Sequence, residues 1–221
     1  MNTLGNFTTQ KPRQLPVIVA VDRSGSMYAD GKIDALNTAL RNFVDSVKKE
    51  TSSRAEINLA LYSFGGTTAS LDLPLTPISA VGDVPVYEAS GMTPMGEAFE
   101  MIKTLIEDRD AITSRAYKPT IVLITDGYPN DDWKSKMDVL INDGRSSKAF
   151  RMAMAIGDDA DTDMLRSFVS TPEYLVRGEN ARDIKKFFRY VTMSVTSRMK
   201  SQTPDQVQVL DYPSDDEVLE F

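Results

Sequence analysis

Two short apolar segments that each end in an aspartate constrain the fold of this chain more than any other feature. Residues 16–22 read PVIVAVD and residues 120–126 read TIVLITD, so threonine is the only polar residue before either acid. A continuous apolar run of this length is typical of a strand buried on both faces of a parallel sheet. Because neighbouring parallel strands need a crossover connection, we expect helices to cover both faces of that sheet.

The rest of the chain alternates between helical and extended patterns. Apolar residues spaced three and four apart predict helices over residues 33–47, 94–106, 133–142, 164–169 and 181–199. Further strands are expected over residues 55–64, 69–75, 150–156 and 174–176. Gly65-Gly66 and Pro74 favour an antiparallel hairpin at a sheet edge for the first two of these. The pattern therefore predicts an α/β fold, a doubly wound, Rossmann-like, mostly parallel sheet with one antiparallel edge strand and helices on both faces.

The negative charge is concentrated toward the C-terminal end. The 221 residues carry a net charge of −7, and every charged residue after Ser201 is an acid. These acids are Asp205, Asp211, Asp215, Asp216, Glu217 and Glu220. We therefore divide the chain into an N-terminal extension (residues 1–13), one domain (residues 14–202) and an acidic tail (residues 203–221). Both ends are expected to be at least partly flexible.

The composition excludes several classes of function. The chain has no cysteine and no histidine, which excludes disulfides, Cys-based zinc sites and catalysis by Ser-His or Cys-His pairs. The net negative charge disfavours nonspecific binding to nucleic acid or to anionic membranes. No apolar run reaches the roughly 18 residues of a membrane-spanning helix, and residues 1–14 lack the apolar core of a signal peptide. We therefore expect a cytoplasmic protein.

Three segments at the expected carboxyl ends of the strands share one kind of chemistry. They are DRSGSM (residues 22–27), GMTP (residues 91–94) and TDG (residues 125–127). If the fold is as predicted, all three lie at one edge of the sheet, where ligands bind in such folds. They supply carboxylates and hydroxyls but no nitrogen or sulfur ligand. Oxygen-only ligands select a hard cation, so this set favours Mg²⁺, with Mn²⁺ as a close competitor.

The pattern Asp-x-Ser-x-Ser, then Thr, then Asp-Gly after an apolar strand resembles the metal-ion-dependent adhesion site of von Willebrand factor A (vWA) domains. The resemblance covers about residues 15–200 and fills all five family positions, which are Asp22, Ser24, Ser26, Thr93 and Asp126. Within that family, residues 91–98 and 125–133 are similar to bacterial TerY-type proteins, which are associated with tellurite-resistance and stress gene clusters. Arg23 departs from the small or hydroxyl residue of many relatives, at a position that is not a ligand.

The resemblance implies a mechanism. Ser24, Ser26 and Thr93 would bind Mg²⁺ directly through neutral hydroxyls, whereas Asp22 and Asp126 would hold it largely through water, and Asp22 would also fix the serine loop. The cation would then keep a position that an outside carboxylate can fill. This implies a non-enzymatic, Mg²⁺-dependent module that binds an Asp or Glu of a protein partner, in a tellurite-resistance or stress-response system.

Each loop also has a purely structural interpretation. Thr93 before Pro94 could serve only as a helix N-cap, Asp126-Gly127 could be only a turn, and the serine loop could only cap the next helix. The joint occurrence of the three loops, rather than any one of them, favours the metal site.

Three other features near these loops have two interpretations each. Asp159, Asp161 and Asp163 suggest a calcium loop, but Met164 and Ser170 replace the glycine and glutamate that it needs, which favours a helix-capping loop. Asp131-Asp132 could start the helix at Trp133 or contribute to a binding rim. Most methionines are expected in the core, but Met27 and Met92 flank the metal loops and are candidates for the binding surface.

Two alternative functions remain open from the sequence. In the first, the chain is a structural or scaffold protein whose metal site is filled by its own acidic tail or by a neighbouring copy. In the second, Asp22 is the nucleophile of a metal-dependent phosphohydrolase. That chemistry usually needs a second acid two residues on, where Ser24 stands, and the chain has no histidine to act as a base. The sequence does not indicate an oligomeric state.

Overall fold

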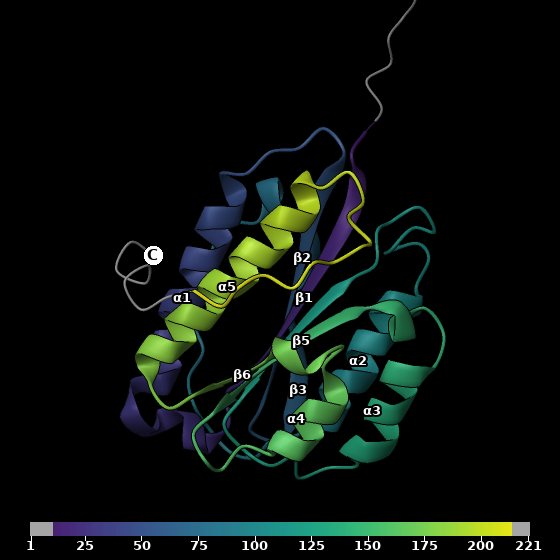
Figure 1. Ribbon diagram of the computed structural model, residues 1–221. Helices are drawn as coiled ribbons and strands as arrows, with labels where there is room; N and C mark the ends of the chain where they lie inside the picture. The colour runs from purple at the N-terminus through teal and green to yellow at the C-terminus, as the bar shows by residue number, and fades with distance from the viewer. Residues whose placement is uncertain (1–10, 214–221) are drawn as a thin grey trace, which may run out of the picture.

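The computed structural model describes residues 11–213 and shows a sheet with helices on both faces (Figure 1). Within these residues the sheet has six strands in the order β3-β2-β1-β4-β5-β6. The strands are β1 (Arg13–Asp22), β2 (Ala55–Gly65), β3 (Thr68–Pro77), β4 (Thr120–Thr125), β5 (Phe150–Ile156) and β6 (Leu175–Gly178). All neighbouring pairs are parallel except β2 and β3, which form the antiparallel hairpin at one edge. The predicted fold class is therefore confirmed.

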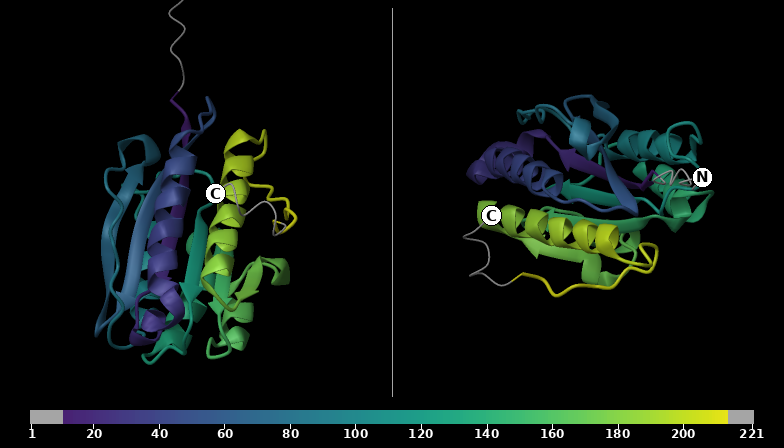
Figure 2. Two further views of the ribbon diagram at one scale, coloured as in Figure 1. Left: turned by 90° about the vertical axis from the view of Figure 1, so that its left-hand side faces the viewer. Right: turned by 90° about the horizontal axis from the view of Figure 1, so that it is seen from above.

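The helices pack in two groups. They are α1 (Lys32–Lys48), α2 (Met95–Glu107), α3 (Trp133–Asn142), α4 (Thr162–Phe168) and α5 (Ala181–Lys200). Helices α1 and α5 lie together on one face, and α2, α3 and α4 lie on the other (Figures 1 and 2). An aromatic contact joins two helices of each group, Phe43 with Phe188 between α1 and α5 and Phe99 with Phe168 between α2 and α4. The central strands are buried from both sides, as their apolar sequences predict.

The start of β1 differs from the expectation. The strand begins at Arg13, three residues before the expected Pro16 and inside the segment assigned as an extension. The backbone N–H of Arg13 donates to the carbonyl of Arg54 at 2.9 Å, and the Arg13 guanidinium stacks 3.9 Å from the centre of the Tyr117 ring. Pairing with β2 thus extends β1 through polar residues at the sheet's end, where no apolar pattern marks a strand. Residues 1–10 lie outside the described residues.

The C-terminal segment also differs from the expectation of a flexible tail beginning at residue 203. Residues 201–213 run back along α5 as an irregular strap (Figures 1 and 2). Pro204 and Pro213 are buried, and Val207 and Leu210 pack against the core. Among the acids assigned to the tail, Asp205 accepts a 2.8 Å hydrogen bond from the Lys118 N–H. Asp215, Asp216, Glu217 and Glu220 lie outside the described residues.

Candidate metal site

The two aspartates that end the apolar strands lie side by side at the carboxyl edge of the sheet. Strands β1 and β4 are neighbours, and the chain leaves β1 toward β2 on its other side, so this edge is a topological switch point. Asp22 is 0% exposed and Asp126 is 1% exposed. Burying two carboxylates this close together is costly unless each finds partners. The structure shows those partners for both residues.

Asp22 connects the serine loop to β4. One carboxylate oxygen, Oδ1, accepts the N–H of Ser24 at 2.7 Å, and the other, Oδ2, accepts the hydroxyl of Thr125 at 2.6 Å. Burial raises the pKa of Asp22 to about 6, because the charged form loses its hydration. The hydrogen bonds from Thr125 and Ser24 oppose this rise, while the nearby Asp126 adds to it.

The three hydroxyl side chains lie close to one another and to Asp126. The Oγ atoms of Ser24 and Ser26 are 3.0 Å apart, and the Ser26 hydroxyl donates to Asp126 Oδ1 at 2.6 Å. A Cβ built on Gly127 would lie 3.7 Å from Thr93 Oγ1 and 3.8 Å from Ser26 Oγ. The fold therefore brings all five predicted residues to one place, although they come from three separate loops.

A pair of glycines positions the loop that carries Thr93. Gly66, in the turn between β2 and β3, forms a β-bridge with Gly91. The Gly66 N–H donates to the Ser90 carbonyl at 2.7 Å, and the Met92 N–H donates to the Gly66 carbonyl at 2.8 Å. A Cβ on Gly91 would lie 2.4 Å from the Gly66 Cα, and Gly91 has a φ of +68°, so only glycine fits here. The sequence predicts the hairpin turn at Gly65-Gly66 but not its contact with the second loop.

The loop after β4 holds the start of α2. Asn130 and Thr93 exchange two hydrogen bonds: the Thr93 N–H donates to Asn130 Oδ1 at 3.0 Å, and the Asn130 N–H donates to the Thr93 carbonyl at 3.2 Å. Both oxygens of Asp131 accept backbone N–H groups at the first turn of α2, from Gly96 and Glu97, at 2.9 Å each.

These contacts correct two interpretations. Asp131, rather than Thr93, caps α2, and Pro94 takes the N-cap position of that helix. Of the Asp131-Asp132 pair, only Asp132 lies at the start of α3, where its carboxylate accepts the Ser135 hydroxyl at 2.6 Å. Asp131 therefore neither starts α3 nor projects from a rim. It fastens α2 to the loop that follows Asp126.

Lys32 is a part of the site that sequence reasoning missed. At the start of α1, its Nζ lies 2.8 Å from Asp126 Oδ2, and the two side chains are 14% and 0% exposed. The pair therefore neutralises one buried carboxylate of the site. No local pattern predicts this contact, because the partners are 94 residues apart.

Met27 and Asp161, two further residues that the sequence singles out near the site, have structural roles. Met27 is fully buried in the core, whereas Met92 is 55% exposed beside Thr93. Asp161 accepts the Met164 N–H at 2.9 Å and caps α4, as the structural interpretation of that loop predicts. Among residues 11–213, no group of three or more acidic side chains could hold a metal ion. A cation at the carboxyl edge would therefore depend on the hydroxyl residues.

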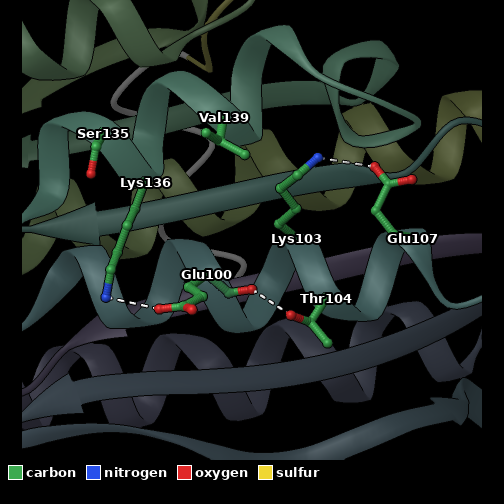
Figure 3. Close-up of a pocket in the computed structure, with 7 residues that line it drawn as sticks. All are labelled: Glu100, Lys103, Thr104, Glu107, Ser135, Lys136 and Val139. Carbon is green, nitrogen blue, oxygen red and sulfur yellow. Dashed lines mark hydrogen bonds and ion pairs between the residues drawn. The ribbon is translucent and has the colours of Figure 1, made fainter.

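A groove between α2 and α3 lies apart from these loops (Figure 3). It is lined by helix side chains; one ion pair, Lys136 with Glu100 at 2.8 Å, spans it, and another, Lys103 with Glu107 at 3.2 Å, lies within α2. None of the five predicted metal residues lines it. Its charges are satisfied by one another, so it adds nothing to the chemistry of the carboxyl edge.

Comparison with known proteins places the chain in a family. The family model of the von Willebrand factor type A domain matches residues 17–190, and the chain belongs to this family. A comparison with curated protein sequences gives no match. No helix among the described residues is long and apolar enough to cross a membrane.

Solved structures from distant organisms share the fold. One is proximal thread matrix protein 1 from the mussel byssus, in a structure whose metal-ion-dependent adhesion site (MIDAS) motif is occupied by zinc. It is 17% identical to this chain over 82% of this chain and 45% of its own length, with a TM-score of 0.59. The pilus adhesin SpaC from Lactobacillus rhamnosus GG is 14% identical over 86% and 31%, with a TM-score of 0.65. A von Willebrand factor type A protein from Catenulispora acidiphila is 18% identical over 82% and 42%, with a TM-score of 0.62. The chain thus spans less than half the length of each.

Proposed function

We propose that this chain is a non-enzymatic protein-interaction module that binds Mg²⁺ and, through it, a carboxylate of a protein partner. The observation that carries the proposal is the meeting of three hydroxyls and two buried carboxylates from three loops at one sheet edge. This oxygen-only set fits a hard divalent cation, and Mn²⁺ would also be accepted. The zinc-occupied MIDAS motif of the mussel protein supports a divalent cation at the equivalent motif.

The proposed roles follow from charge and burial. Ser24, Ser26 and Thr93 would hold the cation through neutral oxygens, with Asp22 and Asp126 acting largely through water. Because neutral ligands leave much of the cation's charge uncompensated, a bound Mg²⁺ would attract an external carboxylate. The hydrogen bonds of Asp22 to Ser24 and Thr125 support its additional role in fixing the serine loop.

The proposed setting is a cytoplasmic tellurite-resistance or stress-response system. Its support is the similarity of residues 91–98 and 125–133 to TerY-type proteins.

The fold leaves fewer acids for the scaffold alternative, in which the acidic tail fills the metal site. Asp205 bonds to Lys118 at the amino edge of the sheet, the opposite edge from Asp22. Of the tail acids, only Asp211 and those beyond Pro213 remain for this role.

Calorimetry with MgCl₂ tests the metal site. Wild-type protein should release a binding heat that Thr93→Ala and Ser26→Ala each weaken at least ten-fold, because each removes one direct ligand. Thr104→Ala removes a hydroxyl that bonds within α2, to Glu100, and is the matched control that should leave the affinity unchanged. Undiminished Mg²⁺ affinity in both site variants would overturn the assignment.

Two further experiments test the class of function. Affinity capture from the host in Mg²⁺ and in EDTA should yield different sets of bound proteins. Phosphate esters and nucleotides should not be hydrolysed above the metal-only blank, because Ser24 stands where such enzymes need a second acid and the chain has no histidine. A clear rate that Asp22→Asn abolishes would favour the phosphohydrolase instead.

A further inference from the structure

Each loop of the candidate metal site carries one exposed apolar side chain. Tyr28 follows Ser26 by two residues, Met92 precedes Thr93, and Tyr128 follows Gly127. We name these three side chains the apolar rim. Within residues 11–213, four large apolar side chains are more than half exposed: Tyr28 (80%), Val86 (68%), Tyr128 (62%) and Met92 (55%). Three of the four therefore stand next to the predicted metal residues in the chain, and Val86 lies in the connection that leads to Thr93.

The backbone around the rim is fixed, so these side chains are held outward. The Met27 N–H donates to the Ser24 carbonyl at 3.1 Å, and Met27 itself is buried. The Met92 N–H donates to Gly66, and the Gly127 N–H donates to the Thr125 hydroxyl at 3.2 Å. The hydroxyls of Ser26 and Thr93 both lie close to Gly127, so each rim residue stands within two positions of a residue at the same point of the site.

A cluster of exposed apolar side chains around a polar centre indicates a binding surface. Single exposed apolar residues are ordinary, but a group that gains nothing from the fold marks a contact with another molecule. Tyrosine and methionine are enriched at protein interfaces because they offer large, adaptable apolar area, and tyrosine adds a polar tip. The rim therefore predicts apolar side chains on either side of the partner's carboxylate that reaches the metal.

The charges near the rim limit the ligand further. The loops of Tyr28 and Tyr128 each carry an exposed acid, Asp30 and Asp132. Of the two basic residues in or next to these loops, Lys32 is already paired with Asp126, and Arg23 donates to the Ser63 hydroxyl at 3.3 Å and lies near Asp72. A run of acids would be repelled there, whereas a single carboxylate between apolar residues would not.

We infer that this surface recognises a protein partner through an isolated acidic residue flanked by apolar side chains. The inference rests on the proposed metal site and adds the partner's chemistry to it. The carboxylate supplies the metal dependence, and the contacts of its neighbours with Tyr28, Met92 and Tyr128 supply the selectivity. In the chain's own residues 214–221, three acids stand next to one another, but Glu220 stands between Leu219 and Phe221 and fits the same description, so this segment is tested as a competing ligand.

Labelled peptides in fluorescence anisotropy test the inference. With Mg²⁺, the peptide GSLFELFSG should bind at least ten-fold tighter than GSGGEGGSG, and its glutamine counterpart GSLFQLFSG should not bind. Tyr28→Ser and Tyr128→Ser should each weaken GSLFELFSG roughly three- to ten-fold through lost apolar contact. Val139→Ser, which changes an apolar side chain on α3 that is 39% exposed, is the matched control and should have no effect.

The outcomes separate this inference from the proposed function. Mg²⁺ binding measured by calorimetry should be the same in the rim variants and in wild type. If Mg²⁺ binds but the two glutamate peptides bind equally well, or the rim variants bind GSLFELFSG like wild type, the inference is wrong and the metal site stands. If no Mg²⁺ heat is seen, both fail. Tighter binding of the peptide SDDEVLEF (residues 214–221) would show instead that the chain's own tail is the ligand.

Discussion

The two buried carboxylates of the site are balanced in different ways at the scale of single residues. Asp126 pairs with a cation, Lys32, at 2.8 Å. Asp22 is balanced by hydrogen bonds from the Thr125 hydroxyl and from Ser24, and burial raises its pKa to about 6. Replacing Lys32 or Asp22 should therefore change stability and metal affinity in ways that identify each role.

Lys32→Met should weaken the metal-free protein and strengthen its binding of Mg²⁺. Without Lys32, the fully buried Asp126 loses the cation that lies 2.8 Å from its Oδ2, at a cost of about 3 kcal/mol in EDTA. A divalent cation beside Asp126 no longer faces the repulsion of the ammonium group, so its affinity rises. Thermal unfolding in EDTA and in Mg²⁺, together with calorimetry, measures both effects.

Lys48→Met, in the last turn of the same helix, is the control for the loss of one positive charge. It should change neither the metal affinity nor the difference between the two unfolding temperatures. A Lys32→Met protein that binds Mg²⁺ more weakly than wild type would show that the lysine supports the metal instead of competing with it.

Asp22→Asn should stabilise the metal-free protein near pH 7 and abolish Mg²⁺ binding. A carboxyl whose pKa is higher in the folded than in the unfolded state stabilises the fold while it is protonated. That contribution is complete below pH 3.8 and is lost as the pH rises through about 6. At pH 7 the ionised Asp22 therefore costs about 3 kcal/mol, which neutral asparagine avoids.

Urea unfolding in EDTA between pH 5 and pH 8 measures this effect. The stability gained by Asp22→Asn should grow from pH 5 to pH 7 and then stay level. Asp45→Asn, at an exposed position of α1, is the control for the removal of one negative charge. A variant that is less stable than wild type at pH 7 would show that the charge of Asp22 is needed for folding even without metal.

At the scale of the elements, Asp131 holds α2 in place for Thr93. Asp131→Ala removes two hydrogen bonds from the first turn of α2 and should cost about 1–2 kcal/mol of stability. Because Thr93 lies two residues before α2, the Mg²⁺ affinity should fall as well. Asp132→Ala loses only the contact to Ser135 within α3, so it should keep the wild-type affinity. Equal affinities in the two variants would contradict this coupling.

The elements themselves were largely predictable, whereas their mutual contacts were not. Helix α3 and strand β5 have the expected bounds, because apolar periodicity is a local signal that burial enforces. The bonds of Asp131 to α2, of Gly66 to Gly91 and of Lys32 to Asp126 join residues 25 to 94 positions apart. No periodicity encodes such pairs. The five residues of the candidate metal site could be predicted as a group because each follows or precedes a recognisable element and because their pattern resembles that of vWA domains.

At the scale of the whole molecule, the strap 201–213 joins the last helix to the sheet. Arg198, at the end of α5, donates to the carbonyls of Pro204 at 2.9 Å and Lys118 at 2.8 Å, and also to the Thr120 hydroxyl. Burial lowers the pKa of Arg198 to about 10, so the side chain stays charged at neutral pH. The acidic composition of the segment hid this packing, because its inward-facing positions, Pro204, Val207, Leu210 and Pro213, recur every three residues, which is neither an α-helical nor a strand period.

Two truncations distinguish the strap from the acids that follow it. A chain ending at Ser201 loses the packing of the strap and leaves Arg198 with fewer partners, so its unfolding free energy should fall by on the order of 3 kcal/mol. A chain ending at Pro213 keeps every contact of the strap and should unfold like the full chain. Both should bind Mg²⁺ with wild-type affinity, because β4 separates the Lys118 end of the sheet from the metal loops. Denaturant unfolding and calorimetry on the two truncated proteins provide the measurement.

If the chain ending at Pro213 binds Mg²⁺ or a glutamate peptide more tightly than the full chain, the acids of residues 214–221 compete for the site. If the chain ending at Ser201 is as stable as the full chain, the strap contributes nothing to the fold.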